Sequence, residues 1–246
     1  MPHCWEIFER LAEGGVSLKL ETDGSRIDAA AADRIVSLGI DCVQISVDGA
    51  TAATHHRVRP GGSFASAIAA IERLVARGHP PQFVFAPTRF NLPEILPAYD
   101  LAVALGCSAF VTGPLMRLGR AALAWNDVAP TDAAWKDAES ALRKHAPASP
   151  TATALSIYPW DIVTEMERRL ASPQAMLLVV PNGKVKLLNA LPFAPADLRR
   201  HSLEEAWDAY RSAWRSDEVR NFVAGCRADP ARLTHANETW PVHVTR

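Results

Sequence analysis

The segment CVQISVDG, residues 42–49, decides the fold of this chain. β-Branched apolar residues alternate through it and Asp-Gly, a frequent turn pair, ends it, so we predict a short buried strand. A helix is predicted on each side of this strand. One covers residues 28–38, with Asp28 as its N-cap, and the other covers residues 63–77. A strand between two helices is the repeating unit of α/β proteins with parallel sheets.

The same alternation continues in both directions along the chain. A helix with one apolar face lies near the N-terminus. Another is predicted at residues 91–105, where Asn91 is the expected N-cap and Glu94 stands at the capping-box position. Further strands are predicted at residues 16–20, 83–86 and 109–112. Four strands separated by helices predict an α/β fold with a parallel sheet.

The pattern changes after residue 120. A helix is expected at residues 131–145, followed by a linker rich in Pro, Ala and Ser at 147–150. Asn-Gly at 182–183 lies between two apolar runs and predicts a hairpin, and a capping box at 202–205 opens another helix. We therefore predict three parts, which are an α/β body at 1–120, a helical connector at 121–150 and a smaller α+β module at 151–246.

The composition excludes several classes of protein. Apolar residues make up 48% of the 246 residues, which is too apolar for a disordered chain. With 26 basic and 27 acidic residues the formal charge is −1, so we expect neither nucleic acid nor a membrane surface as a partner. No apolar run approaches the roughly 20 residues that cross a bilayer, and the first residues lack a signal-peptide pattern. The default expectation is a cytoplasmic protein.

The cysteines point away from a metal site. Cys4, Cys42, Cys107 and Cys226 are far apart, and none belongs to a C-x-x-C pair. We therefore predict buried or incidental thiols and no metal ligands.

Ligands of α/β folds bind at the carboxyl ends of the strands. Asp23, Ser46 and Asp48 follow the first two predicted strands. Asp23 and Asp48 each precede a glycine, so each is either a turn residue or a ligand contact. Ser46 either satisfies a strand end or faces a ligand. From the residues alone, Arg59 is either a surface charge or a partner of nearby acids.

Several of these segments, in this order, resemble the later part of the core of radical S-adenosylmethionine (SAM) enzymes. They are TDG at 22–24, VQISVDGA at 43–50, HHRVR at 55–59, NL at 91–92 and PLMRLGRA at 114–121. Segments 181–185, 202–207 and 218–226 resemble the C-terminal SPASM or twitch extension of the subgroup that often modifies peptides. The resemblance implies a partial (β/α) barrel with about four of six parallel strands, followed by a SPASM/twitch-like module.

The resemblance also implies SAM as a cofactor, held in the first part of the chain. Ser46 and Asp48 would lie near the ribose and methionine, and Arg59 at the methionine carboxylate. Leu115 and Met116 would flank the adenine. The complete set of implied cofactor-binding residues is Asp23, Ser46, Asp48, Arg59, Leu115 and Met116.

The chain departs from the family pattern where the family binds its 4Fe–4S cluster. The C-x-x-x-C-x-x-C loop and the Gly-Gly-Glu segment are absent, Leu188 stands where a cysteine is expected after the hairpin, and Asp229 stands where Cys226 would have a partner. Cleavage of SAM needs a low-potential electron from such a cluster. We therefore expect no catalytic residue in this chain and no radical chemistry by these residues alone.

Two functions stay open. In the first, the chain is the C-terminal portion of a radical SAM enzyme whose start lies upstream. In the second, it is a cluster-free descendant that binds a peptide or a partner enzyme. In either case the strand at 16–20 is an open sheet edge, and we expect the N-terminal helix, a second subunit or a missing segment to cover it.

Overall fold

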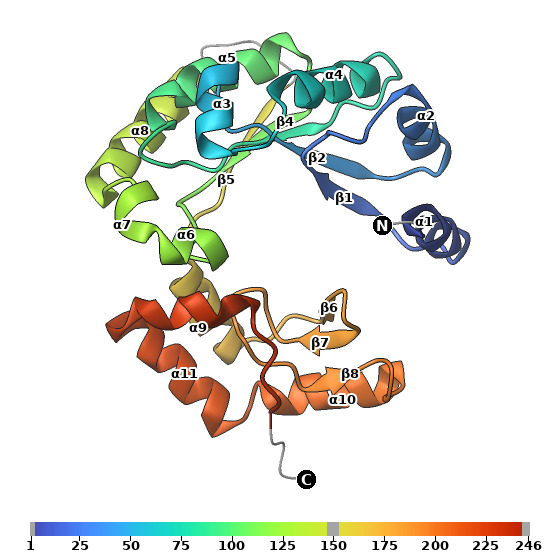
Figure 1. The fold of residues 1–246 in the computed structure, drawn as a ribbon, viewed down its shortest axis with the longest axis vertical. Helices are drawn as coiled ribbons and strands as arrows, with labels where there is room; N and C mark the ends of the chain where they lie inside the picture. Colours follow the sequence, from blue (N-terminus) through green and yellow to red (C-terminus); the bar gives the residue numbers. More distant parts are fainter. Residues whose placement is uncertain (1–2, 147–152, 243–246) are drawn as a thin grey trace. The chain divides into compact units, whose positions relative to one another are not determined.

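The computed structural model describes residues 3–146 and 153–242, which form two compact units (Figure 1). Met1–Leu115 and Ala129–Pro159 make up the first unit, and Met116–Val128 and Trp160–Arg246 make up the second. The units interleave along the chain, whereas the sequence predicted three consecutive parts. The linker predicted at 147–150 lies outside the described residues. No described helix is long and apolar enough to span a membrane.

The first unit is built on a parallel sheet whose strand order follows the sequence. This confirms the predicted α/β class. The strands are β1 Lys19–Thr22, β2 Cys42–Ser46, β3 Gln82–Val84, β4 Ala109–Thr112 and β5 Ala154–Ile157. Strand β5 is a fifth member, beyond the four or so that were predicted. It was missed because its four residues follow a long helix and were assigned to the C-terminal module.

Helices connect these strands and cover one face of the sheet (Figure 1). They are α2 Ala29–Ser37, α3 Ala52–Val58, α4 Phe64–Val75, the short 3-10 helix η1 Leu92–Glu94, α5 Ile95–Ala104 and α8 Asp132–His145, and a further helix, α1 Cys4–Glu13, precedes β1. The Asp28 side chain accepts a hydrogen bond from the Ala31 N–H, which confirms the predicted cap of α2.

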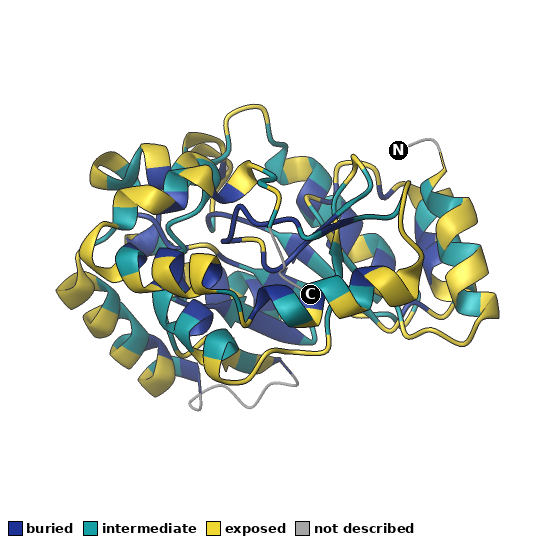
Figure 2. Cartoon of the chain, turned by 90° about the horizontal axis from the view of Figure 1, so that it is seen from below, coloured by how far each residue is buried: buried dark blue, intermediate teal, exposed yellow. Residues whose placement is uncertain are grey.

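The two faces of the sheet differ in polarity. Along β2, Val43 and Ile45 are buried on the helix side, where Phe110 of β4 stacks on Phe83 with ring centroids 5.5 Å apart. In Figure 2 the buried residues, dark blue, lie in the interior, and the exposed residues, yellow, lie on the outer sides of the helices. Gln44 and Ser46 point to the opposite face and are only half-buried. That face is polar and partly open, which is what a ligand-binding face requires.

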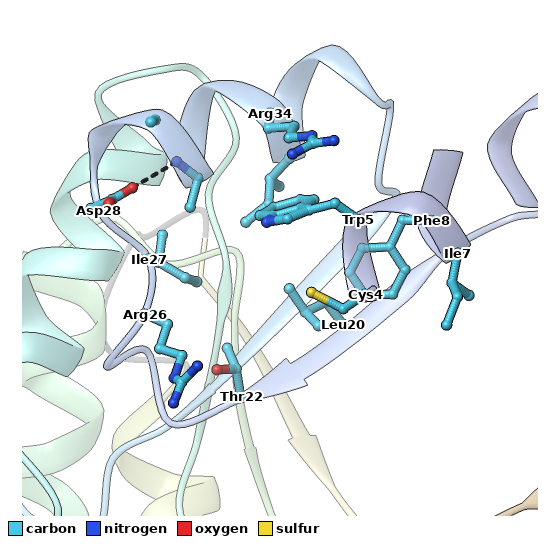
Figure 3. Close-up of a pocket in the computed structure, with 13 residues that line it drawn as sticks. Cys4, Trp5, Ile7, Phe8, Leu20, Thr22, Arg26, Ile27, Asp28 and Arg34 are labelled. Atoms are coloured by element: carbon cyan, nitrogen blue, oxygen red, sulfur yellow. Dashed lines mark hydrogen bonds between the residues drawn. The ribbon is translucent and has the colours of Figure 1, made fainter. Parts of the chain in front are cut away.

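Strand β1 is an edge of the sheet, and α1 lies beside it. Trp5 and Phe8 of α1 pack against the core near Leu20 of β1 (Figure 3). No residue of α1 is fully buried, and a cavity of about 780 Å³ remains between α1, β1 and α2. The N-terminal helix, one of the three predicted covers, therefore lies at this edge but does not fill the space beside it.

The second unit combines helices with a small antiparallel sheet. Its elements are α6 Gly119–Leu123, α7 Trp125–Val128, α9 Ile162–Ala171, β6 Leu178–Val179, β7 Lys184–Lys186, β8 Ala196–Asp197, α10 Leu203–Ala213, α11 Asp217–Ala228 and the 3-10 helix η3 Pro230–Asn237. The hairpin at Asn182 and Gly183 is confirmed, and Gly183 adopts the positive φ of 80° that this turn requires. The capping box of Ser202 and Glu205 is confirmed as well.

Candidate functional site

The turn after β1 uses the Asp23 carboxylate. That carboxylate accepts hydrogen bonds from the hydroxyl and the N–H of Ser25, at 2.7 and 3.0 Å, and these bonds lower the pKa of Asp23. Gly24 has a φ of 77°, and a Cβ there would approach Ala67 and Ala70 at 3.1 Å. Asp23 therefore has a structural role in this turn, and its exposed side chain lies at the carboxyl end of β1.

A buried ion pair follows β2. The Nε of Arg59 donates to the Asp48 carboxylate at 2.8 Å, and the side chain of Asp48 is only 3% exposed. Arg59 itself is 35% exposed, and within the described residues its terminal nitrogens contact no acceptor. A Cβ at Gly62 would come within 2.7 Å of the Arg59 Cδ, so Gly62 leaves room for this side-chain conformation. One nitrogen of the guanidinium is thus fixed by a hydrogen bond, and the two terminal nitrogens are available as donors.

His55 supports the same loop from helix α3. Its ring is buried, and its Nδ1 accepts the Asp48 backbone N–H at 3.1 Å. Burial lowers the pKa of His55, so the ring is neutral near neutral pH and Nδ1 can act as an acceptor. The sequence alone did not reveal this role, because it depends on the loop folding back so that the ring meets the N–H of Asp48, seven residues earlier in the chain.

Asn91 joins the ends of β2 and β3. Its Oδ1 accepts from the Thr88 N–H and hydroxyl, and its Nδ2 donates to the carbonyls of Asp48 and Ala86, each at 3.0 Å. Asn91 is the N-cap residue of the 3-10 helix η1, as predicted by position, but its side chain makes no cap hydrogen bond. Glu94 does not complete a capping box either. It accepts from the Ala50 N–H at 2.8 Å and from the Thr54 hydroxyl.

The other predicted cofactor residues are placed less closely. Ser46 is half-buried on the open face of β2, two residues before Asp48. Leu115 is half-buried near the end of the first unit's segment after β4. Met116 belongs to the second unit and packs against its core. The structure thus gathers Asp23, Ser46, Asp48 and Arg59 at the carboxyl ends of two neighbouring strands, and the adenine contacts stay a prediction.

The cysteines do not fit an iron–sulfur cluster, which needs several neighbouring thiolates. Burial raises the pKa of Cys107 to about 12 and that of Cys226 to about 11, so both stay protonated thiols. Cys4 and Cys42 are half-buried. Across residues 3–146 and 153–242, no three His, Cys, Asp or Glu side chains are grouped to hold a metal ion.

The buried acceptor role of His55 predicts a pH dependence of stability. Because the folded-state pKa of His55 lies below its ordinary value of 6.5, unfolded chains bind more protons, and stability falls as the pH drops through 6.5. We expect the melting temperature to fall between about pH 7 and pH 5, and the slope to flatten in His55→Asn, whose Oδ1 replaces Nδ1 as acceptor. Scanning fluorimetry across this range measures both slopes. An unchanged slope in the variant would contradict the assignment.

Comparisons with known proteins agree with this architecture. Residues 1–94 match the family model of the radical SAM superfamily. Mycofactocin maturase MftC of Mycobacterium ulcerans (strain Agy99) is 35% identical over 133 residues, which cover 54% of this chain and 36% of that protein. The AdoMet-dependent heme synthase of Methanosarcina barkeri is 30% identical over 120 residues, which cover 48% of this chain and 34% of that protein. The chain thus spans about a third of the length of these relatives.

Solved structures share the fold at low sequence identity. Streptococcus suis SuiB superimposes with a TM-score of 0.67 at 9% identity, covering 90% of this chain and 54% of SuiB. SuiB bound to S-adenosylmethionine gives a TM-score of 0.63 at 10% identity, covering 91% of this chain and 53% of that one. The family match over residues 1–94, the aligned relatives and the parallel α/β sheet together support membership of this chain in the radical SAM superfamily.

Proposed function

We propose that this chain forms the methionine-carboxylate side of a SAM site in a radical SAM protein that acts on a peptide. Arg59 is the main support. Its Nε is held by buried Asp48, and within the described residues no acceptor takes up its terminal nitrogens. A guanidinium fixed in this way presents N–H donors in the planar geometry that suits a carboxylate. SAM carries such a carboxylate on its methionine part.

The neighbouring residues fix the position of Arg59. Asp48 orients the guanidinium, while His55 and Asn91 hold the Asp48 backbone through its N–H and its carbonyl. The hydroxyl of Ser46, on the open face of β2, is a hydrogen-bond partner for the ribose or methionine. Bound SAM supplies a radical only after its sulfonium receives an electron, and the cysteines here do not fit a cluster that would deliver it. We therefore propose that these 246 residues alone do not cleave SAM.

A peptide is the proposed substrate class because of the proteins that this chain resembles. One relative is called a mycofactocin maturase, and SuiB has been solved bound to its precursor peptide SuiA. The second candidate is a cluster-free protein that binds a peptide or a partner enzyme. It is favoured by Leu188, which is buried where the family pattern expects a cysteine ligand, and by the protonated thiol of Cys226.

The SAM site is tested with ligands rather than variants, so that folding does not confuse the result. Calorimetry compares SAM with decarboxylated SAM, which lacks only the group that Arg59 would contact. Charge-assisted hydrogen bonds contribute roughly 1.5–3 kcal/mol, so we expect SAM to bind at least tenfold more tightly. Methylthioadenosine, which lacks the amino acid altogether, is the matched control for the nucleoside. Equal affinities for all three ligands would contradict the role of Arg59.

The absence of radical chemistry has its own test. After anaerobic reconstitution with iron and sulfide, we expect no stoichiometric 4Fe–4S absorbance, because the buried thiols stay protonated and apart. With SAM and a strong reductant we expect neither methionine nor 5′-deoxyadenosine. A formed cluster together with these products would favour the catalytic candidate over the cluster-free one.

A further inference from the structure

A groove in the second unit is not used by the proposed SAM site. It lies between the C-terminal part of α10 and the segment at residues 170–175, which begins in the last turn of α9, and its volume is about 390 Å³. Aromatic and basic side chains of α10 and of the two residues after it line one wall. They are Trp207, Tyr210, Arg211, Trp214 and Arg215. Two of them, Tyr210 and Trp214, are buried.

The aromatic wall of this groove is held in place. The rings of Trp207 and Tyr210 stack with centroids 5.5 Å apart and an interplanar angle of 12°, and Trp214 meets Tyr210 edge-on at 6.2 Å. The Tyr210 hydroxyl donates to the carbonyl of Gln174 at 2.8 Å, which ties the opposite wall to α10. A wall that is already ordered binds an apolar side chain without paying a large ordering cost on association.

Two positive charges flank the aromatic wall. Arg211 lies in the last turn of α10 and Arg215 lies two residues beyond its end, and both line the groove. Both are exposed, and in the described part of the chain neither forms an ion pair or a side-chain hydrogen bond. By contrast, Arg169 of α9 pairs with Glu165, and Arg220 of α11 pairs with Asp217.

We propose that this groove binds a peptide segment that carries carboxylate side chains next to a large apolar side chain. The apolar side chain would lie against the half-buried ring of Trp207, and the carboxylates would pair with Arg211 and Arg215. Nucleic acid is a poorer fit, because the whole chain has a formal charge of −1 and two arginines do not form a basic stripe. The occupant is therefore an acidic-apolar peptide.

This inference takes only the peptide class of the partner from the proposed function. The groove belongs to the second unit, and its test uses no SAM, so the two proposals fail separately. If the chain binds the peptide but does not distinguish SAM from decarboxylated SAM, the groove proposal is supported and the SAM-site proposal is contradicted. A chain that distinguishes the two SAM ligands but does not bind the peptide would contradict the groove proposal alone.

The test is fluorescence anisotropy of a short fluorescein-labelled peptide of Glu, Leu and Phe, titrated with the full chain. Two exposed ion pairs together are worth roughly tenfold in affinity, so we expect Arg211→Gln/Arg215→Gln to weaken binding about tenfold. Added salt should weaken wild-type binding as well. The matched control is Arg200→Gln/Arg220→Gln, which removes the same charge from exposed positions of the same unit and should leave binding unchanged.

Three results would overturn the inference. They are equal binding of a peptide in which Lys replaces Glu, equal weakening by the control variant, and full competition by inorganic phosphate or an oligonucleotide at low concentration. Trp207→Leu adds an independent measurement, because it removes the stacked ring while leaving both charges. This variant should weaken the Phe-containing peptide more than one in which Phe is replaced by Ala. Circular dichroism melts verify that each variant is folded.

Discussion

Asn91→Ala is expected to lower the free energy of unfolding by about 3–5 kcal/mol, because each buried polar group left without a partner costs roughly 1–3 kcal/mol. The variant removes the partner of the Thr88 N–H and of the carbonyls of Asp48 and Ala86. Asn91 is fully buried, so water molecules do not take the place of these hydrogen-bond partners in the variant. Urea denaturation followed by circular dichroism measures the loss.

Two further variants separate the hydrogen bonds of Asn91 from its volume. Asn91→Asp keeps the oxygen that Thr88 uses but turns an oxygen toward two carbonyls, so it should be at least as destabilising as alanine. Asn221→Ala, at an exposed position of helix α11, should stay within about 0.5 kcal/mol of the wild type. If Asn91→Ala behaved like Asn221→Ala, the two strand ends would not depend on this side chain.

Local features of this fold were predictable from the sequence, and distant ones were not. Asp28 and Ser202 were identified as helix caps because their hydrogen-bond acceptors and donors lie three residues apart. The same reasoning identified the position of Asn91 but not its hydrogen bonds, because its donor reaches Asp48, which lies 43 residues earlier in the chain. A helix therefore begins next to Asn91 without a cap hydrogen bond from its side chain.

The candidate site shows the same division. Its location after β2 followed from the general rule for parallel sheets, which pointed to Asp48, whereas Arg59 was identified through the family resemblance. A nearby acid was one expected partner of Arg59, but the sequence did not identify Asp48 as that acid, because the pair depends on the turn of chain after α3, where Gly62 leaves space for the Arg59 side chain. Likewise the strand β5 was missed, since a run as short as ALSI at 154–157 has no pattern that distinguishes it from a loop.

The second large effect is expected for Arg59→Met, which should lower the free energy of unfolding by about 3 kcal/mol. Removing one partner of a buried ion pair typically costs roughly 3–5 kcal/mol, because the remaining charge stays buried and unpaired. Here that charge is the carboxylate of Asp48, whose side chain is 3% exposed. The loss should fall at the low end of the range, because Arg59 is 35% exposed and solvent already screens part of the attraction.

A double-mutant cycle with Asp48→Asn shows whether the cost comes from the pair itself. Once Asp48 is neutral, removal of Arg59 no longer leaves a buried charge, so the double variant should be more stable than the sum of the single losses predicts, by about 1–2 kcal/mol. Additive losses would mean that Arg59 stabilises the loop by packing alone. In that case Asp48 would not orient the guanidinium, and the proposed carboxylate contact of SAM would lose its structural support. The same cycle therefore tests both the stability of the loop after β2 and the geometry on which the cofactor proposal depends.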